Sequence, residues 1–374
     1  QRSPQNILFG KGQRRALGAV ARSLGSRAFV CTDSRLSTDP DFLGMMDDLK
    51  TKDVAVRVFD ETATELPLEC LDACVAAAAG FNPDIVIGIG GGSCMDLGKA
   101  AALMLTHGGR VSDYYGELKV PGPLRPLISI PTTAGTGSEV SPVAVLSDPE
   151  MAMKVGIASP HLVSHTAICD PELTYSCPSN LTSISGCDAL THAIEAYTAI
   201  QRPVTAALSQ ERVFVGKNIL SDHYALRAIE LISRSLLQAQ ANNEAARDDL
   251  MLAALYAGLA FGTAGTAAAH AIQYPVGALT HTAHGTGVAL MLPFVMDFNR
   301  PARVAEYAQV ALAMGIRRDG QTHEMLSHAA IEAVADLLAK AGIPKTLADI
   351  GVEAEQLQPL AEQSFTAQRL VNNN

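Results

Sequence analysis

The chain has 374 residues and a mass of 39.3 kDa, more than one hydrophobic core usually holds, so we expect two domains. Hydrophobic residues make up 48% of the sequence and the mean hydropathy is +0.16, which excludes a disordered chain. A net charge of −10 at pH 7 argues against nucleic acid or an anionic membrane as the main partner. Seven cysteines at irregular spacings do not form a disulfide framework, so we expect a cytoplasmic protein.

Short apolar segments of β type alternate with helical patterns in the first half of the chain. We expect four strands, at residues 28–31, 54–59, 85–87 and 127–130. Strands that alternate with helices indicate βαβ units and a parallel sheet. After about residue 178 the strand signals fade, and helical periodicity is found in the segments 181–199, 224–239, 245–260, 287–296 and 331–341.

The sequence therefore predicts an α/β domain with a parallel, Rossmann-like sheet over residues 1–178 and an all-helical domain over residues 179–374. The uncharged segment 251–269 is long enough to span a bilayer. Its glycines and threonines favour instead a buried interior helix, which we expect to end near Pro275.

A glycine-rich segment follows the third predicted strand and precedes a helix. Gly90, Gly91 and Gly92 lack Cβ atoms, so backbone N–H groups can close around an anion there. Ser93 can add a hydrogen bond or cap the helix. The segment matches neither the Walker loop nor the G-x-G-x-x-G pattern. The succession of strand, glycines and helix favours a diphosphate site over a purely structural turn.

A second stretch of small residues, 131–139, follows the fourth predicted strand. It carries four hydroxyl groups and two glycines at the carboxyl end of a strand, where ligands bind in open α/β sheets. A ligand-binding loop and a structural turn rich in Ser and Thr fit this stretch equally well.

One carboxylate and three imidazoles in the helical half indicate a metal site. Asp188 and His192 lie four residues apart in a helical pattern, so both project from one face. His270 follows the uncharged segment, and His284 comes fourteen residues later. Together they provide three nitrogens and one oxygen for a divalent transition metal. The alternative is that Asp188 pairs with a cation and the histidines are structural.

Two nearby residues have more than one interpretation. His281, three residues before His284, is a candidate spare ligand, proton carrier or loop histidine. Glu195 shares a helical face with Asp188 and His192, so it could support a ligand through a hydrogen bond, but we favour a solvated glutamate.

These segments resemble the iron-containing (group III) alcohol dehydrogenases over nearly the whole chain. The glycine-rich segment is similar to the family's GGGSxxDxxK loop, and the small-residue stretch is similar to its PTTAGTGSE loop. A DPEL turn and the two segments that provide the family's metal ligands also have counterparts. The matching ranges are residues 90–99, 131–139, 170–173, 186–198 and 270–299.

The resemblance implies a metal-dependent NAD(H) oxidoreductase that interconverts a small alcohol and an aldehyde or ketone by hydride transfer. It implies metal ligation by Asp188, His192, His270 and His284, with Fe²⁺ as first choice and Zn²⁺ compatible with the same ligands. The cofactor site that it implies comprises Asp33, Gly90, Gly91, Gly92, Ser93, Asp96, Thr132, Thr133, Thr136 and Lys154. A carboxylate at position 33 accepts hydrogen bonds from the adenosine ribose and repels a 2′-phosphate, so we expect NAD rather than NADP.

The chain departs from the family's pattern near the expected substrate. Tyr274 stands where many relatives have a histidine, and His281 stands where many have an aspartate. We assign both as candidate catalytic residues, and we expect the proton to leave through water, the ribose hydroxyls or His281. Residues 201–220 look like an insertion that lines either the pocket or a subunit contact. The family suggests a homodimer and usually continues past an Asn-Pro-Arg turn, so we expect further residues after Asn374.

Other functions remain compatible with the sequence. A transhydrogenase of the 4-hydroxybutyrate type would keep NAD bound and pass the hydride to a second oxo-acid. A sugar-phosphate cyclase similar to 3-dehydroquinate synthase is disfavoured, because the segment 188–284 is poor in Lys and Arg. A nucleotide-binding protein without enzymatic activity is the least favoured alternative.

Overall fold

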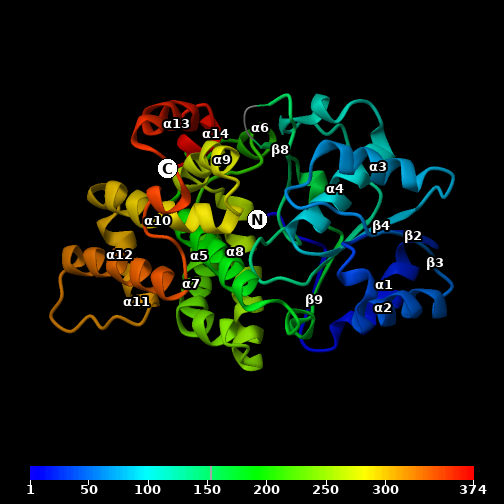
Figure 1. The fold of residues 1–374 in the computed structure, drawn as a ribbon, viewed down its shortest axis with the longest axis horizontal. Helices are drawn as coiled ribbons and strands as arrows, with labels where there is room; N and C mark the ends of the chain where they lie inside the picture. The colour runs from blue at the N-terminus through cyan, green and yellow to red at the C-terminus, as the bar shows by residue number, and fades with distance from the viewer. Residues whose placement is uncertain (152–153) are drawn as a thin grey trace.

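Six parallel strands form the main sheet in the N-terminal half of the computed structural model, which describes residues 1–151 and 154–374. The strand order is β1-β9-β6-β4-β2-β3, and every neighbouring pair is parallel. The strands are β1 (Asn6–Phe9), β2 (Arg27–Cys31), β3 (Ala55–Phe59), β4 (Ile85–Gly90), β6 (Leu127–Pro131) and β9 (Thr166–Cys169). This half lies on the right in Figure 1.

Helices cover both faces of this sheet. Two of them pack with apolar side chains of one face, and the other two pack with those of the opposite face (Figure 1). Because both faces are covered, the central strands are continuous apolar runs, and every residue of β4 and β6 is buried. The helices are α1 (Leu17–Leu24) and α2 (Pro40–Thr51) on one face, and α3 (Leu68–Ala78) and α4 (Gly92–His107) on the other.

A small second sheet lies beside the main one, in the order β5-β8-β7. Its strands are β5 (Gly116–Glu117), β7 (Val143–Leu146) and β8 (Val155–Ala158). Lys99 on α4 is fully buried and donates hydrogen bonds from Nζ to the carbonyl oxygens of Ser141 (3.0 Å) and Val143 (2.7 Å). This lysine therefore ties the start of β7 to α4.

The C-terminal half consists of helices in the part of the chain that the structure describes. Three long helices, α7, α8 and α10, pack around α5, which is buried along most of its length. The helices are α5 (Ser179–Thr198), α6 (Leu208–Glu211), α7 (Ile219–Gln240), α8 (Glu244–Ala264), α9 (Ala268–Thr280), α10 (His284–Asn299), α11 (Val304–Ala313), α12 (His323–Lys340), α13 (Leu357–Ser364) and α14 (Gln368–Val371).

The predicted fold class is confirmed: an α/β half with a parallel sheet precedes a helical half. The four predicted strands correspond to β2, β3, β4 and β6. The short strands β1 and β9 escaped prediction because each has only four residues and lacks strict alternation. The boundary between residues 178 and 179 stays a prediction, although α5 begins at Ser179.

The uncharged segment 251–269 is buried as expected, but the prediction of one continuous helix that ends near Pro275 is wrong. Gly265 has φ of +86°, a left-handed conformation that ends α8, and Pro275 lies inside α9. Among the described residues no single helix has the length and apolarity to cross a bilayer. Helices α8 and α9 meet that criterion only as a pair, and the chain bends by 102° between them.

The two halves touch where the loop after β6 meets α8. Gly137 in that loop has φ of +61°, and a Cβ atom built on it would lie 2.5 Å from Cα of Gly258. A Cβ atom on Gly258 would in turn lie 2.8 Å from Cα of Gly137 and 2.7 Å from Cγ2 of Val140. The close backbone contact therefore requires glycine on both sides.

We predict that Gly258→Ala lowers stability by about 1–3 kcal/mol, because the new methyl group overlaps backbone that cannot move freely. Thermal unfolding followed by circular dichroism measures the loss. Gly44→Ala on α2 is the matched control, since nothing lies within 4 Å of its Cβ position. Equal melting temperatures for Gly258→Ala and the wild type would contradict this packing.

Candidate active site

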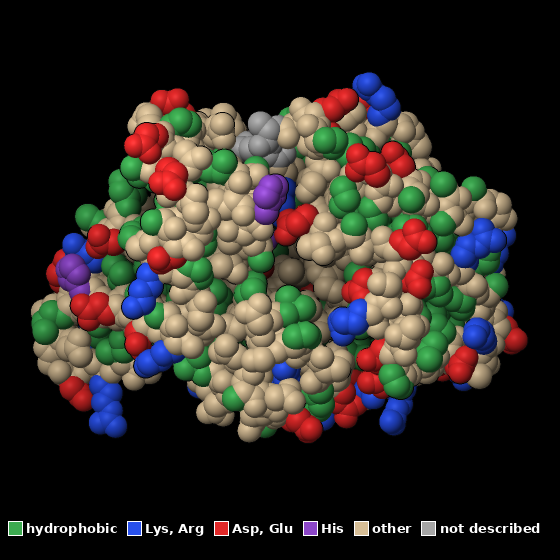
Figure 2. Space-filling model, in the orientation of Figure 1, with side chains coloured by type: hydrophobic (Ala, Val, Ile, Leu, Met, Phe, Trp, Pro, Cys, Tyr) green, Lys and Arg blue, Asp and Glu red, His purple; other side chains and the backbone are tan. Residues whose placement is uncertain are grey.

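A cavity of about 620 Å³ lies between the two halves and has the size of a typical ligand or cofactor site. The space-filling view shows a hollow near the middle of the molecule, between the helical half and the α/β half (Figure 2). Loops after β2, β4 and β6 line one side of the cavity, and residues of α5, α9 and α10 line the other. Nearly all of the site residues predicted from the sequence line this one cavity.

The sheet topology explains where the cavity lies. From β2 the chain adds β3 on one side, and it then adds β4, β6 and β9 on the other. The carboxyl ends of β2 and β4 therefore flank the point at which the strand order reverses, which is where ligands bind in open α/β sheets. Asp33 follows β2 and the glycine turn follows β4, so the topology brings both predicted cofactor segments together.

The glycine turn is built for close backbone approach. Gly90 has φ of +146°, and a Cβ atom there would lie 2.6 Å from Sγ of Cys94. Gly91 is the N-cap of α4, so the free N–H groups of the first helical turn face the cavity region. Ser93 lies in that first turn and does not cap the helix. A Cβ atom on Gly92 would lie 2.8 Å from Cγ2 of Thr136, so the second loop, residues 131–139 after β6, packs directly against the glycine turn.

Asp33 lines the cavity and also orders its own turn. Its Oδ1 atom accepts hydrogen bonds from the N–H groups of Arg35 (3.0 Å) and Leu36 (2.9 Å). Its Oδ2 atom lies 3.8 Å from Sγ of Cys94 on the neighbouring turn. The carboxylate is thus held at the end of β2 with one oxygen committed to backbone.

The second loop is held by an aspartate that the sequence assigned to cofactor binding. Asp96 accepts a hydrogen bond from Oγ of Ser138 (2.6 Å) and another from the N–H of Val145 (3.0 Å). Burial raises its pKa, while the charge of Lys99 opposes that rise. In this structure Asp96 positions the loop, and the cavity side of the loop is lined by Thr132, Thr133 and Thr136.

Lys154 also lines the cavity, where it forms an ion pair with Glu65. Burial lowers the pKa of Lys154 to about 8. The partner Glu65 was not found from the sequence, because no local pattern relates two residues so far apart in the chain.

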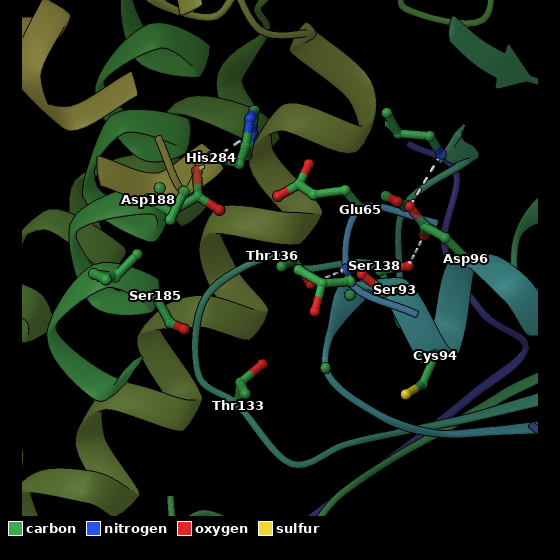
Figure 3. A pocket seen from close by; sticks show the side chains of 18 of the residues that line it. Glu65, Ser93, Cys94, Asp96, Thr133, Thr136, Ser138, Ser185, Asp188 and His284 are labelled. Atoms are coloured by element: carbon green, nitrogen blue, oxygen red, sulfur yellow. Dashed lines mark hydrogen bonds and ion pairs between the residues drawn. The ribbon is translucent and has the colours of Figure 1, made fainter. Parts of the chain in front are cut away.

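The predicted metal ligands converge on one carboxylate oxygen. The Oδ1 atom of Asp188 lies 3.6 Å from Nε2 of His192 and 4.0 Å from Nε2 of both His270 and His284. The ligand atoms of Asp188, His192 and His270 all lie within 4.8 Å of one another. Figure 3 shows Asp188 and His284 pointing toward each other, across the cavity from Ser93.

The cluster fits a divalent metal ion. Oδ1 of Asp188 and Nε2 of His270 are buried, and neither has a hydrogen-bond partner among the described residues. A buried polar atom without a partner costs free energy, and a coordinated cation would satisfy both. Burial lowers the pKa of His192 and lowers that of His284 well below its usual value, so both imidazoles are neutral, the form that binds metal.

A carboxylate oxygen and an amide oxygen orient two of the three histidines. Nδ1 of His270 donates to Oε2 of Glu195 (2.5 Å), and Nδ1 of His284 lies 3.1 Å from Oε1 of Gln273. Each contact leaves Nε2 free to face the cluster. The interpretation of Glu195 as solvated is wrong: the residue is 2% exposed, and it also accepts from the N–H groups of Ala267 and Ala269.

The sequence could have indicated both orienting residues. Glu195 lies three residues after His192 and Gln273 lies three residues after His270, so each shares a helical face with a ligand. Burial opposes the ionisation of Glu195, but the neighbouring His270 and the backbone N–H groups outweigh it and lower the pKa of the carboxyl.

The two candidate catalytic residues lie in different surroundings. Tyr274 lines the cavity, and burial raises its pKa, so its hydroxyl stays protonated at neutral pH. His281 is exposed at the C-cap of α9, with φ of +54°, and it lies outside the cavity lining. Phe214, from the predicted insertion, and Arg369, near the end of the chain, line the cavity although the sequence did not single them out.

Protein-family models match both halves. The model "Iron-containing alcohol dehydrogenase" matches residues 4–171, and "Fe-containing alcohol dehydrogenase family, C-terminal" matches residues 182–374. The chain belongs to the iron-containing alcohol dehydrogenase family. Alcohol and aldehyde oxidoreduction is therefore its chemistry, and the resemblance seen in the sequence is confirmed.

Individual proteins match this chain over more than nine tenths of their length. The chain is 34% identical to the sulfoacetaldehyde reductase of Bilophila wadsworthia over 376 residues, which cover 99% of this chain and 93% of that protein. A crystal structure of 1,3-propanediol oxidoreductase has a TM-score of 0.92 at 31% identity, covering 100% of this chain and 94% of that one. Sulfoacetaldehyde reductase from Bifidobacterium kashiwanohense, in complex with NAD⁺, has a TM-score of 0.82 at 29% identity and covers 100% and 93%.

We predict that Glu195→Gln weakens metal binding by about 10- to 100-fold, because an amide polarises His270 less than a carboxylate does. Competition with a chelator measures the affinity, and thermal unfolding of the metal-free protein reports any separate loss of stability. Glu230→Gln on the exposed face of α7 is the control. Unchanged metal affinity in Glu195→Gln would remove the supporting role.

Proposed function

We propose that this protein is a metal-dependent NAD(H) oxidoreductase that interconverts an alcohol and its aldehyde or ketone. The observation that carries the proposal is the meeting of two sites in one cavity. The glycine turn of Gly90–Gly92, suited to a diphosphate, opens on the same space as the cluster around Asp188. In the direction of reduction, one carbonyl compound, one NADH and one proton give one alcohol and one NAD⁺.

The chain's own residues would hold both groups. Asp188, His192, His270 and His284 would bind the metal, with Fe²⁺ proposed first and Zn²⁺ compatible with the same donors. When both groups are bound, the metal would supply Lewis acidity toward the substrate oxygen and the nicotinamide would supply or accept the hydride. Glu195 keeps the imidazole of His270 oriented throughout.

The proposed dinucleotide site extends along the carboxyl ends of the strands. The first turn of α4 would receive the diphosphate, and Asp33 would face the adenosine ribose, which favours NAD over NADP. Thr132, Thr133 and Thr136 line the same cavity, and we assign them to the nicotinamide half of the cofactor. The relative from Bifidobacterium kashiwanohense was crystallised with NAD⁺, which supports this choice.

Substrate handling involves the metal side of the cavity. Tyr274 is placed to donate a hydrogen bond from its protonated hydroxyl. The role of His281 in proton release stays a prediction, and its exposed position implies a path through water rather than direct contact with substrate. The homodimer and the cytoplasmic location also stay predictions.

The decisive experiment is anaerobic purification, loading with Fe²⁺ and a test of NADH oxidation against a panel of aldehydes. We expect about one metal ion per chain and aldehyde-dependent oxidation that a chelator abolishes. If the metal-loaded protein does not oxidise NADH with any aldehyde of the panel, the proposal is overturned. If hydride passes between an added hydroxyacid and an oxo-acid without net NADH consumption, the protein is a transhydrogenase instead.

We predict that His270→Ala retains no stoichiometric metal and loses at least about 100-fold in turnover, while NAD⁺ binding measured by calorimetry is unchanged. The removed imidazole belongs to the metal cluster and not to the glycine turn. His328→Ala, on the exposed face of α12, is the control. Wild-type metal content in the His270 variant would refute the assignment of the ligands.

We predict that Asp33→Ser lowers the preference for NAD⁺ over NADP⁺ by about 10-fold or more, because the charge that repels the 2′-phosphate is removed. Serine keeps an acceptor for the N–H groups that Asp33 now caps. Asp39→Ser is a matched control, since Asp39 caps α2 in the same way outside the cavity lining. The ratio of kcat/KM for the two cofactors is the measurement, and an unchanged ratio contradicts the role.

A further inference from the structure

An arginine lines the cavity without a carboxylate partner. Arg369, on α14, lines the cavity together with Tyr274 and His270. Its Nη1 atom is buried and has no hydrogen-bond partner among the described residues. Leaving a buried charged donor unsatisfied is costly, so such a group indicates a ligand that the protein itself does not provide.

The guanidinium is held in place from one face. Its Cζ atom lies over the ring of Phe214, 4.5 Å from the centroid. Stacking on an aromatic ring fixes the plane of the guanidinium while its N–H edges remain free for hydrogen bonds. Phe214 is 5% exposed and belongs to the segment 201–220, the predicted insertion that we expected to line either the pocket or a subunit contact.

The carboxylates that line the cavity are engaged elsewhere. Glu65 pairs with Lys154, and Asp96 accepts from Ser138. Asp188 belongs to the metal cluster, and Asp33 accepts hydrogen bonds from the N–H groups of its own turn. In the described part of the chain none of the cavity's acidic groups forms an ion pair with the arginine.

A set of hydrogen bonds fixes the residues just after α14 to the ends of helices that carry metal ligands. Nδ2 of Asn373 donates to the carbonyl oxygens of Ala264 (3.0 Å) and Thr266 (3.1 Å), at the break between α8 and α9. The carbonyl of Asn373 accepts from the N–H of Ile200, just after α5 (3.0 Å). Helix α14 is thereby fixed on the two helices that carry three of the four proposed metal ligands.

We propose that Arg369 binds an anionic group on the substrate, a carboxylate or a sulfonate, and so makes the enzyme specific for alcohols and aldehydes that carry a negative charge. The inference rests on the proposed function and identifies the substrate class of that site. The guanidinium fork donates two parallel hydrogen bonds to such a group, and the stacked orientation on Phe214 leaves that edge available. The reacting carbon then faces the cluster while the charge lies at the opposite end of a short substrate.

Tyr274 complements this recognition. Tyr274 lines the same cavity as Arg369. Burial raises the pKa of Tyr274, and the charge of Arg369 and a side-chain hydrogen bond with it oppose the rise, while Nη1 of Arg369 stays without a partner among the described residues. A protonated phenol donates a hydrogen bond to an anion and carries no charge to repel it.

The test compares charged and neutral aldehydes on the Fe²⁺-loaded enzyme with NADH. The probes are 4-oxobutanoate, sulfoacetaldehyde and butanal, so the two anionic sources are separated from each other and from a neutral substrate. We expect kcat/KM for at least one anionic aldehyde to exceed that for butanal. In Arg369→Gln the kcat/KM for the anionic aldehyde falls by about 10- to 100-fold, mainly because KM rises. The kcat/KM for butanal changes by less than about threefold.

Two further variants separate charge from structure. Arg369→Lys should recover part of the lost activity toward the anionic aldehyde, because it restores the charge without the fork. Arg227→Gln removes a partly exposed arginine that is paired with Glu230 on α7. This variant should leave kcat/KM for all three aldehydes unchanged. Equal losses for anionic and neutral aldehydes in Arg369→Gln, or a wild-type preference for butanal, would overturn the inference.

Failure of the proposed function gives a different result. Protein that binds Fe²⁺ and NAD⁺ but turns over none of the three aldehydes refutes the oxidoreductase proposal, not the anion site. Calorimetric titration with isethionate and with ethanol then tests Arg369 alone. Isethionate binding that weakens by about 10-fold or more in Arg369→Gln supports the site, and equal binding to both proteins refutes it.

Discussion

The site depends on the burial of one carboxylate oxygen among three imidazoles. Oδ1 of Asp188 lies within 4.0 Å of all three Nε2 atoms, and the described residues offer it no hydrogen bond. Such an arrangement is unfavourable in the protein alone and becomes favourable when a cation is shared between the groups. The surrounding helices maintain it: α5 supplies two ligands from one face, and α9 and α10 each begin close to the ligand that they contribute.

The side of the cavity proposed for the nucleotide depends on a different physical constraint. It depends on backbone approach rather than on charge, which is why glycine recurs in the turn after β4 and in the loop after β6. Buried polar side chains then fix that loop: Lys99 holds the start of β7, and Asp96 holds Ser138. Several motif residues thus shape the cavity without facing a ligand, so residues of one motif have both binding and structural roles.

Periodicity predicted the parallel sheet and the helical half, and spacing indicated the first two candidate metal ligands, because each rests on a local pattern. The i, i+4 relation of Asp188 and His192 is visible in any sequence. Other features depend on contacts between distant segments. The burial of Glu195 results from the return of the chain at Ala267, and Arg369 reaches the cavity only because Asn373 binds the α8–α9 break. Helical spacing places Glu195 on the face of His192, but no pattern within one segment encodes its contact with Ala267 or the position of Arg369.

The carboxylate of Glu195 has a consequence for the metal-free protein. It caps the start of α9 through Ala267 and Ala269 and at the same time holds the imidazole of His270. Order at that helix end and affinity for the ion are therefore thermodynamically linked, since whatever stabilises one stabilises the other. Removal of the metal should raise the rate of amide hydrogen exchange in the first turn of α9, so this turn reports whether the site is filled.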